Sequence, residues 1–188
     1  MTATPSPPES SDVQRPGGDP GSPAPNANDH CVFECGAQVF ATSLGAVREV
    51  LSGKLATPVP QAPSALVGVI ELHGDVLPIV QLSALIGVEA RSYTPADAVV
   101  VLSSREARVG IAVDRVLQVR VIDPAALTLS NRDIFKGWYT RTTPRIAVLD
   151  ADALVSHALQ TVITHFRNAL PDPRQRRSRR DASDPVSN

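Results

Sequence analysis

The stretch GVIELHGDVLPIV, residues 68–80, places two apolar runs on either side of His73-Gly74-Asp75. Gly74 supplies the positive φ that a tight hairpin turn requires, so the stretch predicts two strands joined by a turn. Pro78 has no amide hydrogen to donate to a sheet, and we therefore expect its strand to run along a sheet edge or to carry a bulge. His73 could serve as a metal ligand or a catalytic base. We favour the alternative, in which it is only the corner residue of the hairpin.

Short runs rich in Val, Ile and Leu continue along the chain from Cys31, broken by Gly, Pro, Asp and Ser. Closely spaced runs of this kind are typical of strands. Two further hairpins are predicted: CVFEC and QVFATS flank Gly36-Ala37, and AVVVLSS and ARVGIAVDRVLQVRVI flank Arg105-Glu106.

Helical segments are expected to be few. LGAVREVLS (residues 44–52) and QLSALIG (81–87) each predict one or two helical turns. Residues 150–170 predict a longer helix, because their apolar side chains recur with a period of 3.6 residues and Asp150 or Asp152 can cap the start.

The sequence also matches itself at a constant offset of 69 residues, from residue 32 to residue 154. Val32 falls on Val101, Val47 on Val116 and Gly68 on Gly137. A register kept over this length predicts two similar β-rich lobes, built as small barrels that exchange terminal segments and leave a groove between them.

Composition sets the domain boundaries. The first thirty residues contain seven prolines and almost no large apolar side chain, so we expect residues 1–29 to be disordered. Residues 172–188 are expected to form a second disordered segment, with five arginines in RQRRSRR (174–180). This segment is interpreted as a solvated tail, with contact to anionic lipid or nucleic acid as the alternative. One domain, residues 30–171, remains between them.

The chain offers little sign of catalysis or metal binding. Residues 31–170 carry 12 acidic and 12 basic side chains, which gives no electrostatic footprint for nucleic acid. Cys31 and Cys35 lack partners at zinc-ligand spacing, and the four histidines are scattered. We therefore expect no catalytic residues, no metal and no cofactor. The sequence shows no signal peptide or membrane-spanning run, which predicts a cytoplasmic protein.

Four segments together resemble the chemotaxis coupling protein family CheW. LVGVIELHGDVLPIVQLSALIG (66–87) is similar to the family's G-V-x-N-L-R-G turn and V-x-P-I-V-D-L strand. AVREV (46–50), VGIAVDRVLQV (109–119) and RIAVLDADALV (145–155) are similar to three further family elements in the same order. The resemblance spans about residues 31–165.

The resemblance implies a mostly β fold of two SH3-like five-stranded barrels with a C-terminal helix. It also implies a non-enzymatic adaptor that couples the cytoplasmic tip of methyl-accepting chemoreceptors to the regulatory domain of a CheA-type histidine kinase, at arrays on the inner membrane. Contact with the membrane would be indirect, through receptors. The alternatives are a scaffold for pilus motility or development, and a small hydrolase or ligand-binding β-protein of similar architecture.

Nine positions match the elements that family members use for partner contacts. They are Val47, Glu49, Val50, Gly68, His73, Gly74, Gly110, Val116 and Val119. For the valines the alternative is core packing, and for the glycines it is a backbone requirement. Glu49, expected on a helical turn, is the best single candidate, as an anchor for a basic partner.

Two departures from the family pattern concern the signature turn and strand. His73 stands where the family has arginine, and Gln81 stands where it has aspartate. Histidine lacks the permanent charge of arginine, so we expect the turn to lose a fixed ion pair and expect Glu71 to face the His73 ring. An arginine at position 73 is expected to strengthen binding to a typical CheA, whereas the protein's own kinase is expected to respond less or to lose affinity.

Overall fold

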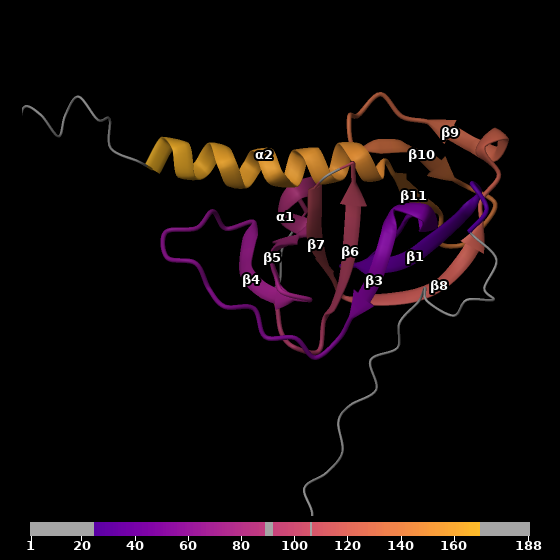
Figure 1. The fold of residues 1–188 in the computed structure, drawn as a ribbon. Coiled ribbons are helices and arrows are strands. Elements are labelled where there is room, and N and C mark those ends of the chain that lie inside the picture. The colour runs from indigo at the N-terminus through magenta and orange to yellow at the C-terminus, as the bar shows by residue number, and fades with distance from the viewer. Residues whose placement is uncertain (1–24, 89–91, 106, 170–188) are drawn as a thin grey trace, which may run out of the picture.

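The structure, a computed structural model, describes residues 25–88, 92–105 and 107–169. Two sheets form its body (Figure 1). The six-stranded sheet has the order β8-β1-β2-β11-β10-β9 and the five-stranded sheet has the order β3-β6-β7-β5-β4. Both sheets remain open in this hydrogen-bond order. The expected disorder of residues 1–29 and 172–188 lies mainly outside the described residues.

Most of the chain is in short strands. The strands are β1 (Asp29–Cys35), β2 (Gln38–Ser43), β3 (Val47–Leu51), β4 (Leu66–Leu72), β5 (Asp75–Gln81), β6 (Ala98–Ser104), β7 (Ala107–Val113), β8 (Arg115–Val121), β9 (Leu127–Leu129), β10 (Phe135–Tyr139) and β11 (Ile146–Leu149). The helices are α1 (Leu82–Ile86), α2 (Ala151–Ala169) and the 3-10 turns η1 (Leu44–Ala46) and η2 (Pro124–Ala126).

The 69-residue offset corresponds to a structural repeat. It carries the β1–β2 hairpin onto β6–β7, and β3, β4 and β5 onto β8, β10 and β11. Each sheet combines the hairpin of one repeat with the remaining strands of the other, since β1 and β2 pair with β8 and β11, while β6 and β7 pair with β3 and β5. The prediction of two lobes that exchange segments is therefore confirmed, with β9 as an additional strand in one lobe.

Successive side chains along the two central hairpins point to opposite faces of the strands. The buried side chains therefore fall into three clusters. On β1, Phe33 faces a central cluster between the lobes, whereas Val32 faces the core of the six-stranded lobe. On β6, Val100 faces the same central cluster, whereas Val101 faces the core of the five-stranded lobe. The paired hairpins thus hold the lobes together through a shared apolar layer.

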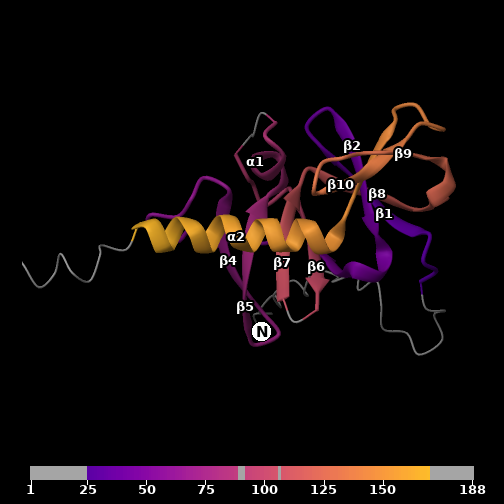
Figure 2. The same cartoon turned by 90° about the horizontal axis from the view of Figure 1, so that it is seen from above.

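Helix α2 crosses strands β6 and β7, as Figure 2 shows. Leu154, Val155 and Ala158 are buried in the central cluster. The side chain of Asp150 accepts a hydrogen bond from the amide of Ala153 at 2.9 Å, so the predicted cap is the first of the two candidates. The three predicted hairpins, the short helix at 81–87 and the long helix are all confirmed.

Three local predictions are wrong in whole or in part. Residues 47–51 form a strand beside β6 and not a helical turn, although η1 supplies one turn just before them. Pro78 lies in an inner strand, since β5 is between β7 and β4, and its ladder with β7 begins only at Ile79. The long run from Ala107 breaks at Asp114, so that β7 and β8 belong to different sheets.

Candidate functional site

The β4–β5 turn is held by its own side chains. His73 and Gly74 have φ values of 54° and 87°, in the left-handed region that a tight turn uses. The amide of Gly74 donates a hydrogen bond of 2.6 Å to Oε1 of Glu71. This bond occupies the carboxylate that we expected to face the His73 ring, so that expectation is corrected.

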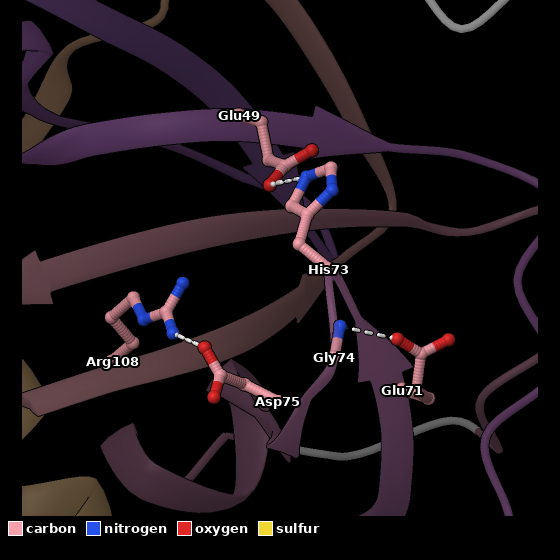
Figure 3. A network of polar contacts seen from close by, with 6 residues as sticks. All are labelled: Glu49, Glu71, His73, Gly74, Asp75 and Arg108. Carbon is pink, nitrogen blue, oxygen red and sulfur yellow. Dashed lines mark hydrogen bonds and ion pairs between the residues drawn. The ribbon is translucent and has the colours of Figure 1, made fainter.

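The His73 ring instead meets Glu49, as Figure 3 shows. Nε2 of His73 lies 3.3 Å from Oε1 of Glu49, with the two side chains 59% and 16% exposed. In the hydrogen-bond order β3 and β4 are the two edges of the five-stranded sheet. The contact therefore joins the two edges and shows that the sheet curls toward a barrel at this end.

A second ion pair lies beside the turn. Asp75, the first residue of β5, pairs with Arg108 on β7 (Figure 3). Both side chains are well exposed, so the pair contributes little to stability. Together Glu49, Glu71, His73, Gly74, Asp75 and Arg108 form a polar network that we call the turn network.

Two of the predicted glycines are buried. A side chain on Gly68 would collide with the backbone carbonyl oxygen of Thr57, which lies on a neighbouring segment bridged to Val69. A side chain on Gly110 would collide with Ile79 and Val99 in the core. Both glycines are required by packing, whereas Gly74 is exposed at the turn.

The predicted valines divide into two groups. Val47, Val50 and Val116 are partly buried against the central cluster between the lobes. Val119 is 56% exposed on β8, an edge strand, beside the exposed apolar residues Leu117 and Val121. We did not predict Leu117 and Val121 as site residues, although their alternate spacing in RVLQVRV was a visible signal.

A groove of about 900 Å³ lies between the lobes, as the repeat predicted. It is lined by the β1–β2 turn, the start of α1, the end of β7 and Pro144-Arg145. None of the nine predicted positions lines it. The predicted residues therefore belong to the outer surface and the core, and not to this groove.

Burial raises the pKa of the Cys31 thiol to about 11. The pKa of Arg115 is raised by its side-chain hydrogen bond to Glu34.

Within residues 25–88, 92–105 and 107–169, no three His, Cys, Asp or Glu side chains gather where they could hold a metal ion. No helix in the same part of the chain is long and apolar enough to cross a membrane.

The fold and the turn network define a two-lobed β-protein with exchanged hairpins and an ion-paired surface turn. Residues 29–159 match the family model described as the CheW-like domain, and the chain belongs to this family. It is 39% identical over 115 residues to the chemotaxis protein CheW of Rhizobium meliloti (strain 1021), a match that covers 61% of this chain and 66% of the relative.

A second relative agrees with this assignment, and a solved structure has a similar fold. The chain is 30% identical over 128 residues to the chemotaxis protein CheW of Thermotoga maritima, covering 65% of this chain and 84% of that protein. Its fold resembles the crystal structure of the scaffolding protein TtCheW from Thermoanaerobacter tengcongensis, with a TM-score of 0.60 and 19% identity over 66% of this chain and 89% of that one.

Proposed function

We propose that this protein is a non-enzymatic adaptor that couples chemoreceptors to a CheA-type histidine kinase. The observation that carries the proposal is the family match over residues 29–159, which includes every strand of both lobes. The partners would be the regulatory domain of the kinase and the cytoplasmic tip of methyl-accepting receptors. The protein would then work in the cytoplasm, at receptor arrays on the inner membrane.

The turn network is the proposed contact for one of these partners. It combines Glu49, His73 and Gly74, three of the nine positions that the family resemblance selects, at one end of the five-stranded sheet. His73 is largely exposed, so a partner can reach the network without opening the core. The exposed stripe Leu117, Val119 and Val121 on β8 is a second proposed contact, because exposed apolar stripes on edge strands are suited to protein association.

Charge reversal at Glu49 tests the proposal. Glu49→Lys places a cation beside His73 and removes the carboxylate that a basic partner would meet, so we expect at least about a tenfold loss of affinity for the kinase regulatory domain or the receptor tip. Asp133→Lys makes the same charge change at an exposed position of the six-stranded lobe and is the control. Equal binding by the parent and Glu49→Lys for both partners would remove the turn network from the interface.

A further inference from the structure

The three carboxylates of the turn network differ in what holds them. Glu71 accepts a hydrogen bond from the amide of Gly74, and Asp75 pairs with the permanently charged Arg108. Glu49 pairs with His73, whose ring carries charge only when it is protonated. Glu49 is thus the carboxylate of the network whose countercharge depends on pH.

Glu49 is partly buried, so the loss of its cationic partner matters more for it than for an exposed carboxylate. Its side chain is only 16% exposed, against 63% for Asp75, so water compensates its charge less well. A partly buried carboxylate is costly without a cationic partner. The charged groups on the neighbouring elements are Arg48 on β3, Glu71, Asp75 and Arg108, with Arg105 on the β6–β7 turn. Of the cations among them, Arg108 is already paired with Asp75.

The position of His73 allows its ring to move away from Glu49. It lies at the corner of the turn, with its side chain 59% exposed, and its left-handed backbone is supported by the Glu71–Gly74 hydrogen bond and not by the Glu49 contact. The ring can therefore leave Glu49 by a side-chain rotation, without any change in the sheet.

We propose that His73 is a proton-controlled competitor for Glu49, and that a lysine or arginine of the bound partner takes its place on this carboxylate. The inference rests on the proposed function, because it names the partner chemistry at the same turn network. Protonated His73 occupies Glu49 and weakens binding. Neutral His73 releases Glu49 to the partner's cation.

The expected direction of the effect follows from the chemistry of the imidazole, because histidine is the side chain that ordinarily changes its charge between pH 5 and pH 8. If the partner binds only the form with a neutral ring, the apparent Kd is lower at pH 8 than at pH 6, in proportion to the competent fraction.

Calorimetric titration with the regulatory domain of the cognate kinase, and separately with the receptor tip, is the test. We expect the parent to bind one of them several-fold more tightly at pH 8 than at pH 6. His73→Asn, which tolerates the left-handed φ and carries no charge, should bind equally at both pH values, as tightly as the parent at pH 8. His73→Arg should bind more weakly than the parent at pH 8. The control is His157→Asn, at an exposed position of α2, which should keep the pH response of the parent.

A second measurement needs no partner. The NMR signals of the His73 ring at pH 6 should differ between the parent and Glu49→Gln, because the variant removes the carboxylate that Nε2 of His73 meets. Unchanged ring signals would overturn the inference whatever the partner. Binding by the parent that does not change between pH 6 and pH 8, or a pH response that survives in His73→Asn, would also overturn it and leave the adaptor function standing. A parent that binds neither kinase nor receptor would instead contradict the proposed function.

Discussion

Gly110 occupies a place in β7 where a side chain has no room. A Cβ there would lie 2.7 Å from Cγ1 of Val99 and would also collide with Ile79, and both neighbours are fully buried. Gly110→Ala should therefore lower the free energy of unfolding by about 1–3 kcal/mol, as measured by urea denaturation. Gly45→Ala is the matched control, because its nearest neighbour would be 3.8 Å away. Equal stability of the two variants would show that the neighbouring core side chains can shift to make room for the added methyl group.

The two cysteines lead to a prediction about reactivity. Cys31 and Cys35 are 3% and 4% exposed, and burial raises the pKa of Cys31 to about 11. Because the thiolate is the reactive form, both thiols should resist iodoacetamide at pH 8 in the native protein and react readily in urea. The folded state keeps the Cys31 proton longer than the unfolded state does, so the contribution of this thiol to stability falls as the pH rises from about 9 to 11. Rapid labelling of the native protein would contradict the burial of β1.

At the residue scale, the sequence predicted individual positions better than their contacts. The turn at His73-Gly74 was predictable from glycine chemistry, and Glu49 and His73 were both selected from the family resemblance. Their contact was not predictable, because residues 49 and 73 lie on opposite edges of a sheet whose curl depends on the whole lobe. The Asp75–Arg108 pair was missed because the parallel pairing of β5 with β7, which brings these two strands together, could not be deduced from the sequence.

At the scale of elements, α2 extends ten residues beyond the family match, which ends at residue 159. Phe166 and Val162 pack against the central cluster, together with Val59 and Ala62 of the β3–β4 connection, and the His165 ring lies 2.8 Å from the carbonyl oxygen of Gln61. Phe166→Ala should therefore cost about 1–3 kcal/mol in thermal or urea unfolding, less than a fully buried phenylalanine. Ile163→Ala, at a side chain that is 60% exposed, should cost almost nothing. A stable Phe166→Ala variant would mean that this end of α2 is not packed in solution.

Elements whose apolar residues recur with a clear period were predicted correctly. Short segments without such a period were not. The 3.6-residue spacing of α2 has a single interpretation, whereas VREV is short and lacks a period of its own. It becomes a strand because β6 offers a free edge for pairing, with Glu49 opposite Val101. The position of Pro78 in an inner strand could not be predicted either. The strand tolerates the proline because β7 pairs with β5 only from Ile79 onward.

At the scale of the whole molecule, the lobes should fold without the ends of the chain. Residues 30–171 contain nearly all of β1 and the whole of every later element. The remaining segments have few large apolar side chains, so they have little to bury. A shortened chain of residues 30–171 should melt within a few degrees of the full chain in calorimetry. A loss of many degrees would show that one of the ends packs on the lobes.

The central claim is that the protein links two partners, and co-sedimentation tests it most directly. Membranes that contain the receptor are mixed with the cognate CheA-type kinase, with and without this protein, and the kinase in the pellet is measured. The account predicts that kinase pellets with receptor membranes only when the protein is present, and that Glu49→Lys reduces the amount recovered. Kinase recovery that does not depend on the protein would contradict the adaptor function.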